Sequence, residues 1–425
     1  MSATISSVFD ELSREVGSTL IGDPYPLFAE RRRETPVMEG DIMGEFGLPA
    51  MAASADGSRP MYTLFRYEDV TAALRDAATF SSRVIMEVME PLFGRVVLGM
   101  DGEEHRLHRG LYAPAFTRRL VESWRQEVMR PVARQMVRGI AATPDKRTNL
   151  VDLALAFPVK MIYQVIGLPE DQEAYDAFAY RALVQQLASM GINRSNPEET
   201  MNARRRGLEA SNVTYEQLLG VVKERRALGS DGDDLMSRMI RSDFEGQRMT
   251  DEQIAGFIRV LLTPASETTT RSFLNVTTLL LQRPEVLDQL RQDRSLILPA
   301  IDEGMRIEPV AVVIGRITTR QVEVRGVTIP AHAGITLCTG SANRDEDVFE
   351  DPEAFNLHRK FRTGLGFGLG PHLCPGMNAA RAEMHETIDA LLDEMPNLRL
   401  DPDQPAPEIR GMMLRSPAAV HVVWD

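Results

Sequence analysis

The chain has 425 residues, of which 43% are hydrophobic, and this ordinary globular composition is enough for a sizeable apolar core. Its formal net charge of −13 argues against a nucleic-acid partner, because proteins that bind nucleic acid usually carry a basic balance. Only two cysteines are present, which argues against a disulfide framework in a chain of this length.

The opening segment, MSATISSVFDELSREV, mixes acids, bases and hydroxyls. A secretory signal needs a continuous apolar stretch of roughly 7–15 residues, which this segment lacks. No stretch of the chain approaches the roughly 18 apolar residues of a membrane span. We therefore expect a cytoplasmic protein with no membrane contact. Because neither linkers nor repeats are visible, we expect one domain over residues 1–425.

Helical spacing of apolar residues dominates the pattern. Three long helices are predicted, over Leu150–Ile166, Asp171–Met190 and Glu198–Glu224. The longest helix is predicted from about Thr250 to Gln282. Thr250 and Gln253 fit a capping box at its start, and the Arg283-Pro284 step ends it. A further helix is predicted to begin at Pro284.

Strand signals are fewer and lie between the helices. Alternating stretches occur at Met61–Arg66, between Gly315 and Gly340, and at Ala418–Val423. Regular alternation of strand and helix is missing, which argues against a parallel α/β sheet. We predict a mainly helical fold with small antiparallel sheets at its periphery.

The segment FGLGPHLCPGMNAARAE surrounds Cys374 with glycines and prolines. Gly366, Gly368 and Gly370 permit positive φ angles and close approach to the backbone. A helix is predicted to begin after Gly376, and its dipole favours the thiolate form of Cys374. The pattern predicts a thiolate on a tight loop, with backbone N–H groups free to donate to sulfur. A buried free cysteine and a nucleophilic cysteine are the alternatives, whereas Cys338 is predicted to be a small buried apolar residue.

The complete segment resembles the haem-binding loop of the cytochrome P-450 family, Phe-Gly-x-Gly-x-His-x-Cys-x-Gly. The matching positions are Phe367, Gly368, Gly370, His372, Cys374 and Gly376, followed by Ala380-Arg381-x-Glu383. This resemblance implies a triangular-prism helical fold that binds haem b (iron protoporphyrin IX), with Cys374 as the iron ligand. It also implies that Phe367, Gly368 and Gly376 contact the haem. Pro375 departs from the aliphatic residue often found there and removes one backbone donor near the sulfur.

The segment from Asp101 to Arg109 resembles the family's Asp-Pro-Pro-x-His-x-x-x-Arg helix. His105 and Arg109 are four residues apart and so point the same way on a helix. The resemblance implies that they hold a haem propionate, with Arg316 and His372 as further partners, because cations bind carboxylates strongly. A metal site built on His105 and His108 is the alternative, although no third ligand is evident.

Glu303-x-x-Arg306 lies before the cysteine loop, and Arg359 follows it. Residues three apart on a helix can pair. The resemblance implies that the three side chains form a buried structural group.

The predicted long helix contains Glu267 and Thr268, which resemble the acid–alcohol pair of the family pattern Ala-Gly-x-(Asp/Glu)-Thr-Thr. A hydroxyl near the iron can hold a donor water, and a carboxylate behind it can relay protons from solvent. Pro264 and Ala265 depart from the Ala-Gly positions. Pro264 is expected to kink or unwind the helix at Val260, and Ala265 is expected to lie against the haem and narrow the pocket slightly.

The resemblance implies a dioxygen-dependent monooxygenase that acts on an apolar small molecule. It places the substrate pocket at residues 82–100, 182–194, 255–263, 309–314 and 410–414. The predicted lining residues are Ile85, Met86, Met89, Leu92, Phe93, Val97, Leu98, Val310, Val312, Val313, Met412 and Met413. Arg83 is in position to meet a substrate carboxylate, but solvation is the simpler interpretation of an arginine.

The chain ends shortly after its last predicted strand, so we expect a monomer without a fused reductase. Electrons are then expected from a separate ferredoxin and its reductase, which use NAD(P)H indirectly for this enzyme. A local basic patch would be needed for docking, and the candidates are Arg106, Arg118, Arg119 and Arg362. Two other functions remain open: a peroxide-driven or atypical oxidation such as desaturation or coupling, and a non-enzymatic haem sensor or electron carrier.

Overall fold

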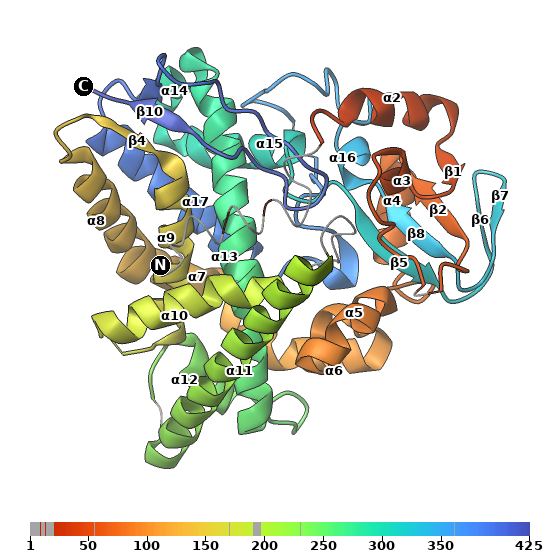
Figure 1. Ribbon diagram of the computed structural model, residues 1–425, viewed down its shortest axis with the longest axis horizontal. Helices are drawn as coiled ribbons and strands as arrows, with labels where there is room; N and C mark the ends of the chain where they lie inside the picture. Colours follow the sequence, from red (N-terminus) through yellow and green to blue (C-terminus); the bar gives the residue numbers. More distant parts are fainter. Residues whose placement is uncertain are drawn as a thin grey trace.

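The computed structural model describes Phe9, Ser13 and residues 21–54, 56–169, 171–189, 197–229, 231–360 and 362–425. A long helix, α13 (Asp251–Leu281), runs through the middle of the molecule (Figure 1). The helices that pack on α13 are α9 (Leu150–Ile166), α10 (Gln172–Val184), α11 (Pro197–Leu228), α12 (Leu235–Arg241), α14 (Pro284–Gln292), α15 (Ile297–Ile307) and α17 (Met377–Glu394). This arrangement makes α13 the core element of a mainly helical fold, as predicted.

The remaining helices surround this core. They are α2 (Tyr25–Glu34), α3 (Ile42–Glu45), α4 (Tyr67–Arg75), α5 (Arg83–Phe93), α6 (Gly102–Tyr112), α7 (Arg118–Trp124), α8 (Arg130–Ala141) and α16 (Thr339–Ala342). Short turns of 3₁₀ or π-helix follow several of them: η1 (Val97–Gly99), η2 (Ala113–Phe116), η3 (Arg125–Met129), η4 (Gln185–Ser189), η5 (Arg294–Leu296) and η6 (Gly370–His372). None of the helices within the described ranges combines the length and apolarity needed to cross a bilayer.

The main sheet lies to one side of α13, away from α8, α9 and α17 (Figure 1). Its strand order is β1 (Val37–Glu39), β2 (Met61–Leu64), β8 (Gly334–Leu337), β5 (Ile314–Thr318) and β3 (Phe80–Ser81). The β2–β8 pair is parallel, so the prediction of purely antiparallel sheets is wrong here. A parallel pair needs a long crossover, which the helical chain between these two strands supplies, and residue periodicity does not report such partners.

Two smaller sheets are antiparallel, as predicted. One has the order β4 (Arg147–Asn149), β10 (His421–Val423) and β9 (Arg399–Leu400). The other is the hairpin of β6 (Val322–Val324) and β7 (Val327–Ile329).

The predicted helices agree closely with the structure where both are defined. Helix α9 has the predicted bounds. The capping box of α13 is present: Thr250 Oγ1 accepts from the Gln253 N–H at 3.2 Å, and Gln253 Oε1 accepts from the Thr250 N–H at 2.9 Å. The helix predicted at Asp171–Met190 is α10 continued by η4, and Met190 lies outside the described residues, as do residues 191–194 of the predicted pocket and most of the opening segment.

Pro264 lies inside α13, which continues as an α-helix on both sides of it. The expectation that this residue unwinds the helix is therefore wrong. Proline removes only its own N–H bond, to the Val260 carbonyl. The packing of α9, α11 and α15 against α13 holds the rest of the helix together, because most helical stability in proteins comes from tertiary contacts.

Candidate functional site

Cys374 lies on a tight loop immediately before α17. Gly368 and Gly370 of this loop have φ angles of 71° and 75°, which favour glycine. A Cβ atom on Gly370 would collide with the Leu74 carbonyl oxygen at the end of α4. The Cys374 N–H donates to the Phe367 carbonyl at 3.0 Å and closes the loop. The glycines therefore permit α4 to press against the loop that presents the sulfur.

The Cys374 sulfur is surrounded by backbone donors and by one cation. Burial raises the pKa of the thiol, and the N–H groups of Gly376 and Met377 and the charge of Arg109 only partly offset it. The expectation of a lowered pKa is therefore wrong for the polypeptide alone, because desolvation exceeds the effect of the helix N-terminus. A metal ion bound to sulfur removes the proton outright. The loop thus suits a metal-bound thiolate better than a free nucleophile.

Two histidines and an arginine of the predicted site lie together beside this loop. Arg109 on α6 donates through Nη2 to the Leu373 carbonyl at 2.6 Å, one residue before the cysteine. The rings of His105 and His372 have centroids 4.3 Å apart. Burial and the charges of His372 and Arg109 lower the pKa of His105 to about 4, so this ring is neutral near pH 7.

Arg316 on β5 is a buried cation. Its residue surface is 4% exposed, and its Nη1 donates to the Gly315 carbonyl at 2.8 Å. Burial lowers its pKa to about 10, and the charge of Asp101 opposes this effect. No carboxylate of the described residues lies within ion-pair distance of it. A buried charge without a counter-ion is costly, so the arrangement fits a bound group that brings its own anions.

A hollow of about 820 Å³ lies beside these side chains. Its lining includes Ser81, Asp101, His105, Arg109 and His372. Within the described ranges, no three His, Cys, Asp or Glu side chains are placed to share a metal ion. The structure thus gives the His105–His108 metal site no third ligand, and the basic lining fits the carboxylates of a haem.

The middle of α13 is open although the rest of this helix is buried. Pro264 and Thr268, one turn apart, are exposed, and Ala265 between them is half-buried, whereas every residue from Thr269 to Leu281 is buried. The Thr268 hydroxyl donates to the Pro264 carbonyl at 2.6 Å. Its oxygen lone pairs remain available as acceptors.

Glu267 points into the protein and forms an ion pair with Arg271. The carboxylate Oε1 lies 2.5 Å from Arg271 Nε, and both side chains are almost completely buried. Arg271 also donates to the Leu414 carbonyl at 2.8 Å and to the hydroxyl oxygens of Ser416 and Ser13 at 2.8 and 3.1 Å. The Glu267 Oε2 atom has no hydrogen-bond partner among the described residues. Arg271 was not identified from the sequence, although its four-residue spacing from Glu267 is a signal for pairing.

The predicted pairing of Glu303, Arg306 and Arg359 is present. Arg306 donates to both Glu303 oxygens at 2.8 and 2.9 Å, and Arg359 Nε donates to Glu303 Oε1 at 3.0 Å. Arg306 also donates to the Asn343 carbonyl at 2.8 Å. These contacts join α15 to the segment that leads into the cysteine loop.

Several residues predicted to line a pocket lie in the core instead. Val312, Val313 and Met412 are fully buried and pack with Tyr25 and Phe28. Their aliphatic character therefore reflects packing, which sequence alone does not distinguish from a pocket wall. The α5 residues are more open: Ile85, Met89, Leu92 and Phe93 are half-buried.

The basic side chains near the loop differ in how far their charge is compensated. Arg106 is paired with both Glu103 and Glu245, so its predicted docking role loses its main support. Arg118, Arg119 and Arg362 are exposed and have no ion pair within the described residues.

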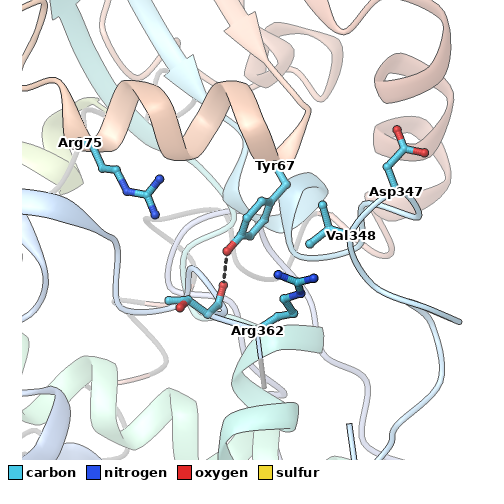
Figure 2. A pocket seen from close by; sticks show the side chains of 6 residues that line it. Tyr67, Arg75, Asp347, Val348 and Arg362 are labelled. Carbon is cyan, nitrogen blue, oxygen red and sulfur yellow. Dashed lines mark hydrogen bonds between the residues drawn. The ribbon is translucent and has the colours of Figure 1, made fainter. Parts of the chain in front are cut away.

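Arg75 was not identified from the sequence as a surface cation of interest. It ends α4, directly against Gly370. Figure 2 shows Arg75 and Arg362 on opposite sides of Tyr67, whose hydroxyl donates to the Thr363 carbonyl at 2.8 Å. These residues line a second hollow of about 390 Å³.

Comparison with known proteins covers nearly the whole chain. A family model for Cytochrome P450 matches residues 50–420. The epoxidase of cyclomarin C, CymV, from Salinispora arenicola is 33% identical over 346 residues, which cover 80% of this chain and 85% of that protein. Nocardicin C N-oxygenase from Nocardia uniformis is 30% identical over 428 residues, which cover 98% and 99%. The crystal structure of HmtT, involved in himastatin biosynthesis, has a TM-score of 0.81 at 27% identity and covers 96% of this chain and 99% of that one.

Proposed function

Because the chain belongs to the cytochrome P450 family of monooxygenases, we propose that it binds haem through Cys374 and inserts one atom of dioxygen into an apolar small molecule. The observation that carries this proposal is the loop itself. It presents a sulfur with two backbone donors beside buried or half-buried basic side chains. A free structural cysteine has no use for such a surround.

The chain's own residues divide the binding of haem between them. Cys374 holds the iron, and Phe367, Gly368, Gly376 and Ala265 contact the ring. Arg109, Arg316, His105 and His372 hold the two propionates, which supply the counter-ions that Arg316 lacks. Bound haem iron supplies the binding and reductive activation of dioxygen, and a thiolate ligand favours cleavage of the O–O bond.

Thr268 and Glu267 supply protons to this site. The Thr268 hydroxyl oxygen holds a donor water at the open part of α13. The proton reaches that water from Glu267 Oε2, the oxygen that Arg271 leaves free. Arg271 fixes the other oxygen, so it is a positioning residue for the carboxylate.

Electrons come from a ferredoxin and its reductase, with NAD(P)H as the indirect source. The docking surface includes Arg75 and Arg362, which flank the cysteine loop and carry uncompensated charge. Arg118 and Arg119 add exposed cations to the same helix-rich half of the molecule. Such a surface complements an acidic electron carrier.

The experiment supplies the holoenzyme with ferredoxin, reductase, NAD(P)H and ¹⁸O₂. The substrates are those terpenes, steroids, fatty acids or aromatics that shift the haem spectrum on binding. We expect products that carry one ¹⁸O atom and that depend on ferredoxin. Products that form equally well from hydrogen peroxide alone would favour the peroxide-driven alternative. A protein that turns over none of its ligands under either condition would favour the haem sensor.

A further inference from the structure

Arg259 on α13 is a half-buried cation without a carboxylate partner. Its Nη2 donates to the carbonyl of Phe93, the last residue of α5, at 2.9 Å. Its guanidinium carbon lies 4.9 Å from the ring centroid of Tyr215 on α11 and 5.5 Å from that of Phe93. Burial lowers the pKa of the guanidinium. In the described part of the chain, no ion pair involves this residue.

Two polar atoms at the same place have unused hydrogen-bonding capacity. Arg259 Nε is buried without a partner among the described residues, and so is Gln185 Oε1. Gln185 begins η4 and is 1% exposed. Its Nε2 donates to the Arg259 carbonyl at 3.2 Å and to Thr263 Oγ1 at 3.3 Å, which ties it to the same turn of α13. Buried polar atoms are normally paired, so a charged donor and an amide left open together indicate a polar ligand.

The surroundings of this pair are apolar. The large hydrophobic side chains that are exposed in the described residues all lie on α5–η1, α10 or α11: Val88, Leu98, Tyr180, Met201, Val213 and Leu228. Val260, next to Arg259, packs with Phe93 and Met89 of α5. A single uncompensated cation within apolar elements favours a ligand that has one anionic group and an apolar body.

We propose that Arg259, with Gln185 beside it, binds the carboxylate of the substrate, which is therefore an amphipathic carboxylic acid. This inference rests on the proposed function and narrows its substrate class. The carboxylate lies between α5 and α11, and the apolar body follows the facing surfaces of α5 and α13. Thr268 is nine positions farther along α13, about 13 Å along the axis at 1.5 Å per residue. The oxidised carbon is accordingly remote from the carboxylate.

The test uses 1-(ω-carboxyalkyl)imidazoles from hexyl to tetradecyl and their methyl esters, titrated into the holoenzyme. The imidazole nitrogen binds the haem iron and shifts the Soret band to longer wavelength, so affinity is read from the spectrum without turnover. We expect at least one free acid to bind tenfold or more tightly than its ester. In Arg259→Gln this preference should fall to about onefold while the affinity for the ester stays within twofold. Arg83→Gln, which alters an exposed arginine on α5, is the matched control and should keep the preference.

Three results would overturn the proposal. The wild-type protein might prefer no acid over its ester at any chain length, the preference might survive in Arg259→Gln, or Arg83→Gln alone might remove it. If Arg259→Gln fails to take up haem, Arg259→Lys decides: it keeps the charge and loses the planar fork, so a weakened preference supports the proposal and an unchanged one contradicts it. Absence of any spectral shift with plain alkylimidazoles would instead count against the haem site itself.

Discussion

Replacement of Arg271 by methionine tests the buried ion pair behind the oxygen-activating segment. Arg271 is fully buried, and Glu267 retains 3% of its side-chain surface, so the substitution leaves a carboxylate in the interior without its counter-ion. Breaking a buried pair from one side typically costs about 3–5 kcal/mol. We expect a loss of that size in the free energy of unfolding, measured for the holoenzyme by urea denaturation followed by circular dichroism.

The double variant Arg271→Met/Glu267→Gln separates charge from packing. It removes the unpaired carboxylate, so it should be more stable than Arg271→Met alone, with a coupling energy of roughly 1–3 kcal/mol. Arg205→Met provides the matched control, because Arg205 and Glu209 have the same four-residue spacing but are 65% and 62% exposed. Its cost should not exceed about 1 kcal/mol. The reasoning fails if Arg271→Met is as mild as the control, or if the second substitution lowers stability further.

Three further predictions concern other parts of the site. Gly370→Ala should lower haem content, measured as Soret absorbance per protein, because a Cβ there collides with α4, whereas Gly139→Ala has open space and should not. Glu383 is buried, and burial raises its pKa to about 8, so wild-type stability should fall as pH rises from about 4 to 8; Glu383→Gln should lose this slope and gain roughly 2 kcal/mol at pH 8, and an unchanged slope would contradict the assignment. Arg362→Gln should weaken ferredoxin-dependent reduction several-fold at low salt, whereas Arg106→Gln, which removes a compensated charge, should change it little.

Local patterns in the sequence predicted local structure well. The capping residues Thr250 and Gln253 located the start of α13, and the Arg283-Pro284 step located its end. Glu303 and Arg306 pair because their spacing on one helix is decided by the helix itself. The cysteine loop was identified because glycine positions and the cysteine form one continuous segment.

Features that depend on distant segments were not predictable in the same way. The parallel partner of β2 is β8, far along the chain, and no periodicity identifies such a partner. Pro264 was expected to break α13, but packing from neighbouring helices outweighs one lost hydrogen bond. The pKa of Cys374 was expected to fall, but its sign depends on burial, which only the folded chain determines. Arg75 joins the loop surface through contact with Gly370, which the sequence does not reveal.

The central claim is that the sulfur of Cys374 binds haem iron. The direct measurement is the absorption spectrum of the reduced holoenzyme under carbon monoxide, compared with Cys374→Ala and with Cys338→Ala, which alters a fully buried thiol elsewhere. The account predicts the red-shifted Soret band of a thiolate-ligated haem for the wild-type protein and Cys338→Ala, and its loss in Cys374→Ala. A wild-type protein without this band, or a Cys374→Ala variant that keeps it, would contradict the account.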